Sequence, residues 1–80
     1  MYKTFSAMNE LLRTAANISP KNCGGKKIED IAMETNISTA MLYKWRSGSN
    51  MSLDKLDTLL NYFQNQEPDR LKMAERILGW

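Results

Sequence analysis

Few side chains in this sequence could carry out a reaction or hold a metal ion. Among its 80 residues there is one cysteine, Cys23, and there is no histidine. A Cys-His nucleophile pair, a Ser-His-Asp triad and an ordinary zinc site all need residues that are missing here. A single cysteine cannot form an internal disulfide, so we expect a reducing compartment, the cytoplasm. The sequence predicts no enzymatic activity and implies no cofactor or metal.

The basic residues are placed unevenly along the chain, and their placement is more informative than the net charge of +2. Residues 1–27 carry five basic side chains against the single acid Glu10. The stretch 35–53 contains no acid, and both Lys44 and Arg46 lie in it. Phosphate groups would meet that stretch without repulsion, which favours a nucleic-acid partner. The alternative is a chance gap in a mixed charged surface.

Apolar residues at steps of three and four predict an all-α fold of five short helices. Pro20 and the glycine pair after Cys23 should stop the first helix near Asn17, which leaves a long basic loop at 18–27. Asn36 should end the second helix, because asparagine tolerates a left-handed backbone. The expected helix ranges are 5–17, 28–35, 38–47, 52–63 and 68–78.

The length and composition are those of one globular domain spanning 1–80. Hydrophobic residues make up 42% of the chain and charged residues 25%, which is an ordinary balance for a soluble protein. No segment approaches the roughly 18 consecutive apolar residues of a membrane-spanning helix. We therefore expect no membrane partner.

The last predicted helix, within 68–80, carries more apolar side chains than docking onto a small core requires. Because 80 residues provide little core area, a partner subunit would add to it. We therefore expect a homodimer that uses this helix, although simple docking onto Phe63 and the first helix is the alternative. The expected interface residues are Leu71, Ala74, Ile77, Leu78 and Trp80.

The second and third predicted helices carry the most informative spacing. Ala32 is small enough for a second helix to cross closely, and Asn36 suits the turn. Ile37 follows the turn directly, and Leu42 and Trp45 would anchor the next helix against the first. This order of a small residue, a turn residue and three apolar residues is typical of a helix-turn-helix.

At these residues the sequence resembles the phage repressor and Cro type of helix-turn-helix proteins, also called XRE-like. Residues 31–32, Ile-Ala, match the Leu-Ala pair of that family, and residues 36–38, Asn-Ile-Ser, match its Gly-Val-Ser turn. Trp45 and Gly48 match its Trp-x-x-Gly ending, and the helix after Ser52 is similar to the next helix of the family. The resemblance implies a lambda-repressor-like DNA-binding fold.

The chain also departs from the family pattern. Ile28 stands where the family commonly has a Gln that holds a phosphate, and Lys26 or Lys27 could replace that contact. Arg46 stands where Glu is frequent, and Thr35 where the family is more apolar. The long first loop and the basic N-terminal half are similar to those of small phage lysogeny regulators.

The resemblance implies a sequence-specific transcriptional regulator, which we expect to be a repressor reading the major groove of double-stranded DNA as a homodimer. The residues that would contact base edges lie on the exposed side of the third helix: Thr39, Ala40, Tyr43 and Lys44. The residues that would contact phosphates flank the two motif helices: Lys26, Lys27, Ser38, Arg46, Ser47, Ser49 and Asn50. Ser38 would also cap the third helix.

Two alternatives stay open at this point. Glu29, Asp30 and Glu34 on the second helix form either a solvated face or, as in related phage repressors, a contact surface for RNA polymerase. The whole chain could also be a helical protein-interaction module, an antirepressor or adaptor, that kept the fold without binding DNA. The modest net charge and the missing Gln favour this second function.

Overall fold

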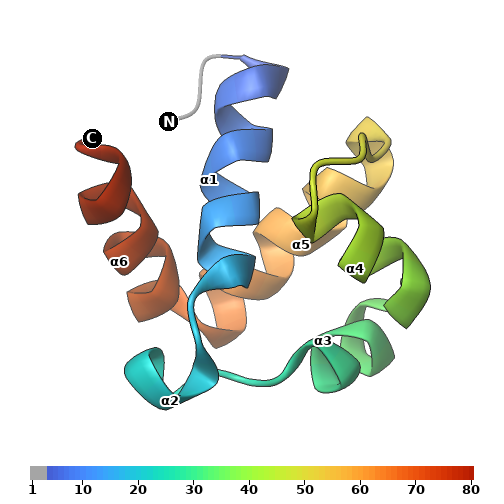
Figure 1. Ribbon diagram of the computed structural model, residues 1–80, viewed down its shortest axis with the longest axis horizontal. Helices are drawn as coiled ribbons and strands as arrows, with labels where there is room; N and C mark the ends of the chain where they lie inside the picture. The colour runs from blue at the N-terminus through green and yellow to red at the C-terminus, as the bar shows by residue number, and fades with distance from the viewer. Residues whose placement is uncertain (1–3) are drawn as a thin grey trace.

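Helices make up most of residues 4–80, the part of the chain that the computed structural model describes (Figure 1). No strand occurs among these residues. The all-α prediction is confirmed. The helices are α1 (Phe5–Asn17), α2 (Pro20–Cys23), α3 (Ile28–Thr35), α4 (Thr39–Arg46), α5 (Leu53–Gln66) and α6 (Pro68–Leu78).

The prediction of five helices misses α2, a single turn inside the predicted loop. The side chain of Ser19 accepts a hydrogen bond from the Lys21 amide and caps this turn. Pro20 occupies the first helical position, where its missing N–H is not needed. Pro20 therefore begins a new helix as well as preventing α1 from continuing, and Gly24, with φ of 69°, ends the turn.

The other predicted helix boundaries agree with the structure to within one residue, except that α5 continues to Gln66, three residues beyond the predicted end at Phe63. The boundaries that agree depend on local capping. Asn36 ends α3 in the left-handed conformation, with φ of 58°. Ser38 caps α4 by accepting a hydrogen bond from the Met41 amide at 3.1 Å, and Ser52 caps α5 in the same way. Gly79, with φ of 78°, ends α6.

Helix α1 lies between α6 on one side and α4 and α5 on the other, as Figure 1 shows. Its buried face joins these helices in one hydrophobic core. The larger side chains of that core are buried and come from five different helices. They are Leu11, Leu12, Ile31, Leu42, Trp45, Leu56, Leu59, Phe63 and Leu71.

The structure corrects part of the predicted dimer interface. Leu71 and Ala74 are 6% and 0% exposed, because α6 packs along α1 and directs both side chains into the core of the same chain. They are not available to a second copy. Ile77 and Trp80 are 62% and 53% exposed, and Leu78 is half-buried. The apolar surface of α6 is therefore smaller than predicted.

A buried arginine, Arg70 of α6, connects the end of α1 with the segment before α3. Its Nε and Nη2 atoms donate to the carbonyls of Ala15 and Ile18 at 2.9 and 2.8 Å, at the end of α1. Its Nη1 atom donates to the Lys26 carbonyl at 3.0 Å and to Glu67 at 3.1 Å. One guanidinium group therefore satisfies the end of α1 and holds the segment that enters α3.

Glu67 completes this buried network. One of its oxygens accepts from the Lys26 amide at 3.1 Å and the other from the Tyr62 hydroxyl. Burial, together with the neighbouring Glu67 carboxylate, raises the pKa of Tyr62. Gly25 lies against this pair, and a Cβ atom at Gly25 would collide with Glu67 and Arg70. The close approach of the chain therefore requires glycine at this position.

We expect the variant Arg70→Met to lose about 3–5 kcal/mol of unfolding free energy, because it leaves a buried carboxylate without its partner. It also leaves three backbone carbonyls without this donor. Urea unfolding followed by circular dichroism measures the change. Arg76→Met, on the exposed side of α6, is the matched control and should change stability by no more than about 0.5 kcal/mol. Equal stability of the two variants would contradict the role assigned to Arg70.

Candidate nucleic-acid interface

Helices α3 and α4 are joined by a tight turn and are anchored to the core through one side each. Ile31 and Ala32 are the buried residues of α3, together with Ile28, and Ile37 in the turn is 4% exposed. Leu42 and Trp45 anchor α4 at 0% and 1% exposure. The opposite side of α4 is consequently directed outward, away from the other helices.

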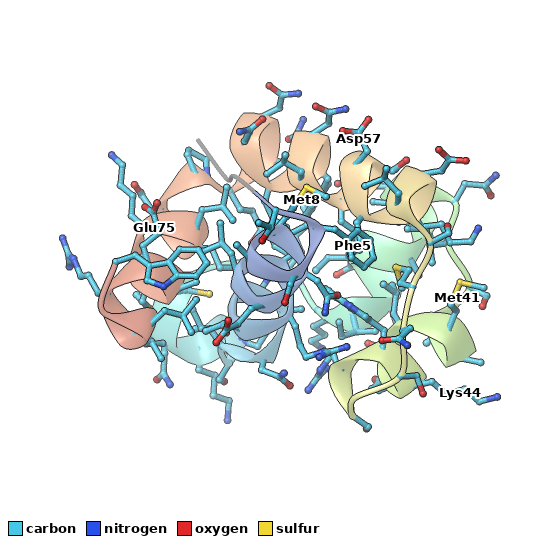
Figure 2. All side chains as sticks on the ribbon, turned by 90° about the horizontal axis from the view of Figure 1, so that it is seen from above. Phe5, Met8, Met41, Lys44, Asp57 and Glu75 are labelled. Atoms are coloured by element: carbon cyan, nitrogen blue, oxygen red, sulfur yellow. The ribbon has the colours of Figure 1, made fainter. Side chains whose placement is uncertain are left out.

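The outward side of α4 holds the predicted base contacts. Ala40, Tyr43 and Lys44 are exposed, and Thr39 is half-buried. Figure 2 shows Lys44 and the neighbouring Met41 extending away from the body of the molecule. Among residues 4–80, neither ion pair involves Lys44. Its ammonium group is therefore available to an external partner.

Tyr43 is less available than the sequence suggested, because it is tied to α3. Its hydroxyl donates to the Glu29 carboxylate at 2.6 Å, and the Arg46 guanidinium lies 5.5 Å from the centre of its ring. This hydrogen bond holds the pKa of Glu29 below its ordinary value and raises the pKa of Tyr43. A base contact by Tyr43 would compete with this bond.

The predicted phosphate contacts before α3 separate into one paired lysine and one exposed lysine. The Lys26 ammonium forms a salt bridge with Glu34 at 2.9 Å, and this bond raises the pKa of Lys26. Lys27 is exposed at the N-cap position of α3, where no side chain caps the helix. Of the two lysines, Lys27 is therefore the one whose side chain takes part in neither ion pair of residues 4–80.

Lys27 and Arg46 line the same hollow, of about 210 Å³, between the end of α1, the start of α3 and the end of α4. Asn17 and Tyr43 line it as well. Two cationic side chains that are 19 positions apart in the sequence therefore converge at one edge of the α3–α4 unit. An anionic group at that edge would be attracted by both and repelled by the Glu29 carboxylate, which lines the same hollow.

The remaining predicted phosphate contacts lie at the two ends of α4. The side-chain oxygen of Ser38 accepts from the Met41 amide, so its role as the helix cap is confirmed. Ser47, Ser49 and Asn50 are exposed in the segment that links α4 to α5. The Ser49 amide donates to the Lys44 carbonyl at 3.0 Å, so this segment folds back against the end of α4.

Three polar side chains of α1 hold the end of α4 and were not identified from the sequence. Arg13 donates to the carbonyls of Trp45 and Ser49, both at 2.8 Å. Asn9 accepts from the Trp45 indole at 2.8 Å, and Asn17 accepts from Arg46 at 3.1 Å. Their spacing of four residues was the available signal, because it places all three on one side of a helix.

The acidic side chains of α3 adjoin the basic residues more closely than the sequence order suggests. Three acidic residues of α3 are exposed, which agrees with the interpretation of this face as solvated: Glu29, Asp30 and Glu34. Glu29 and Glu34 nevertheless bind residues on either side of them, Tyr43 and Lys26. The stretch 35–53 is free of acids in the sequence, whereas in space it borders this acidic surface.

Comparison of the chain with family models, with curated proteins and with solved structures finds no match. Within the described residues 4–80, no helix is long and apolar enough to cross a membrane. The same residues contain no group of three or more Cys, Asp or Glu side chains arranged to hold a metal ion.

The hydrogen bond between Tyr43 and Glu29 predicts a measurable pH effect. Because the pKa of Glu29 is lowered, the stabilisation from this bond is complete above pH 4.5 and is lost as the pH falls through the lowered value. We expect Tyr43→Phe to raise the pKa of Glu29 toward 4.5. Carboxyl NMR titration measures this shift.

Lys72→Ala changes an exposed residue of α6 and is the control for that titration. It should leave the NMR titration curve of the Glu29 carboxyl the same as in the unmodified protein. An identical Glu29 curve in Tyr43→Phe would show that the hydrogen bond is not maintained in solution.

Proposed function

We propose that α3, its turn and α4 form a helix-turn-helix, and that the chain is a sequence-specific DNA-binding regulator of transcription. The observation that carries the proposal is the two-sided character of α4. Leu42 and Trp45 fix its inner side in the core, while Ala40 and Lys44 are exposed on the outer side. A helix held in this way can enter the major groove with its polar side against the bases.

The outer side of α4 offers two kinds of base contact. Ala40, in the first turn, could contact a thymine methyl group, and the Thr39 methyl could add to the same apolar contact. Lys44 could donate to O6 and N7 of guanine. Lys27 and Arg46, which line one hollow, would contact the adjacent phosphates. Phosphate contacts of this kind fix the register of the helix on the duplex.

A second copy of the chain is part of the proposal. One short helix reads only a few base pairs, which are too few to distinguish one site in a genome. Two copies would read half-sites about 34–36 Å apart. The proposed contact between copies consists of Ile77 and the half-buried Leu78 of α6, together with the exposed Trp80 that follows the helix. Repression is the regulatory role that the family resemblance implies, and the single cysteine favours the cytoplasm as its compartment.

One observation favours a second candidate, a protein-interaction module. Met33 is 82% exposed on α3, between the acidic residues Asp30 and Glu34. An exposed apolar side chain within an acidic surface fits a basic protein partner, including a surface of RNA polymerase. In that case α3 would be the contact helix, and α4 would have no separate role.

Binding to duplex DNA distinguishes the two functions. A preferred duplex is first selected from a random library, and its affinity is measured between 50 and 200 mM salt by fluorescence anisotropy. Release of counterions from phosphates makes DNA binding weaken steeply with salt. Failure to select any preferred duplex, or an affinity independent of salt, would contradict the DNA-binding proposal and favour the protein-interaction module.

Lys44→Ala should weaken binding to the selected duplex by about 1–3 kcal/mol and relax the preference at one position, as expected for a base contact. Lys27→Ala should instead weaken binding to all sequences alike and reduce the salt slope by about one. Lys72→Ala is the matched lysine control on α6. An unchanged sequence preference in Lys44→Ala would show that Lys44 does not contact a base.

Ile77→Glu should reduce self-association without unfolding the chain, because Ile77 is 62% exposed. A charge placed in an apolar contact between copies would be desolvated without a partner. Sedimentation equilibrium with and without the selected duplex measures the change. Leu53→Glu, at another exposed apolar position on α5, is the control. Equal association of both variants would rule out α6 as the contact between copies.

A further inference from the structure

Helix α1 presents a row of three polar side chains to the end of α4. Asn9, Arg13 and Asn17 are four residues apart, so they lie one above another on a single side of the helix. This polar row is adjacent to the buried apolar face of α1 and is directed toward α4 and the segment after it. Each of its members forms a hydrogen bond with that region.

Three hydrogen bonds of this polar row reach backbone carbonyls at and just after the end of α4, where the Trp45 carbonyl also accepts from the Gly48 amide at 3.0 Å. The last carbonyls of a helix have no amide partner within it. Arg13 donates from Nε to the Trp45 carbonyl and from Nη2 to the Ser49 carbonyl, both at 2.8 Å. The positive guanidinium also suits the negative end of the helix dipole. Asn17 donates to the Arg46 carbonyl at 3.4 Å.

Apolar packing alone would fix α4 less completely. This helix has eight residues, and its two buried residues, Leu42 and Trp45, lie close together on one side. Two neighbouring apolar contacts resist separation but allow a short helix to tilt about them. The bond from the Trp45 indole to Asn9, at 2.8 Å, adds a directional constraint at the same position. Arg13 extends the constraint to Ser49 in the linking segment.

We propose that Asn9, Arg13 and Asn17 are positioning residues that set the orientation of α4 and of residues 47–50 for sequence readout. This inference rests on the proposed function of α4 as the recognition helix. The three side chains act through α4 and the segment after it, where their partners Trp45, Arg46 and Ser49 lie. Loss of the row leaves the contacts to DNA present but misaligned, and recognition depends on geometry held to a fraction of an ångström.

Arg13→Lys tests the proposal, because it keeps the positive charge and removes the planar group that reaches two carbonyls at once. We expect hydrogen exchange at the amides of Ser47, Gly48 and Ser49 to become at least tenfold faster. We also expect the ratio of affinities for the selected and a scrambled duplex to fall about tenfold, which corresponds to about 1.4 kcal/mol. Affinity for the scrambled duplex should stay unchanged, since the charge is retained.

Two controls separate positioning from a general loss of stability. Arg76→Lys makes the same change on the exposed side of α6 and should alter neither measurement. Leu60→Ala, at a half-buried position of α5, lowers overall stability without touching the polar row. It should leave the affinity ratio unchanged at a temperature where the protein remains folded.

If Arg13→Lys does not fold, Asn17→Ala provides a second variant, because Asn17 is exposed and its replacement removes no buried side chain. Asn61→Ala, at an exposed position of α5, is the control for this variant. A preference as strong in the polar-row variants as in the unmodified protein would overturn the inference while leaving the DNA-binding function intact. If the unmodified protein selects no duplex, the proposed function fails. Unchanged exchange at residues 47–49 would then overturn the positioning role independently of DNA.

Discussion

The buried guanidinium of Arg70 is the constraint on which the arrangement of the helices depends. It is 2% exposed, and its hydrogen bonds reach the end of α1, the segment before α3 and the start of α6. A charge this deeply buried is tolerated only when it is paired and its donors are satisfied. Glu67 pairs with the Arg70 guanidinium. The remaining hydrogen bonds of Arg70 are accepted by the carbonyls of Ala15, Ile18 and Lys26.

Once Arg70 fixes one end of α1, that helix can serve as a platform for its three neighbours, α4, α5 and α6. Its apolar face packs against α5 and α6, and its polar row holds the end of α4. Arg70 also holds the segment that leads into α3 through the Lys26 carbonyl. The end of α4 is thus held by α1 and the segment before α3 by Arg70 of α6, through two separate sets of hydrogen bonds.

Local signals in the sequence predicted the features that depend on neighbouring residues. Asn36 and the capping serines act over one to four positions, so the boundaries of α3 and α4 could be predicted. Arg70 could not be identified as buried with the same ease, although it lies four residues before the buried Ala74 on the same side of α6. Its partners are up to 55 positions away, and only the folded chain brings them together.

In the candidate site, too, the features set by neighbouring residues could be predicted from the sequence, and those set by contacts between helices could not. The exposure of Ala40 and Lys44 followed from the positions of Leu42 and Trp45, because helical periodicity separates the two sides of α4. The bond between Tyr43 and Glu29 depends on how closely α3 and α4 approach, which periodicity does not give. The apolar side of α6 was visible in the sequence, but its division between core and surface was not. Leu71 was consequently assigned to a contact between copies.

An NMR titration of the ¹⁵N-labelled protein with its selected duplex tests most directly whether α4 is the recognition helix. If it is, the largest amide shifts fall on residues 38–50 and at Lys27 and follow the salt dependence of binding, while the outer side of α5 stays unchanged. Shifts concentrated on the acidic side of α3 without changes in α4, or no shifts at all, would contradict the assignment of α4 as the recognition helix.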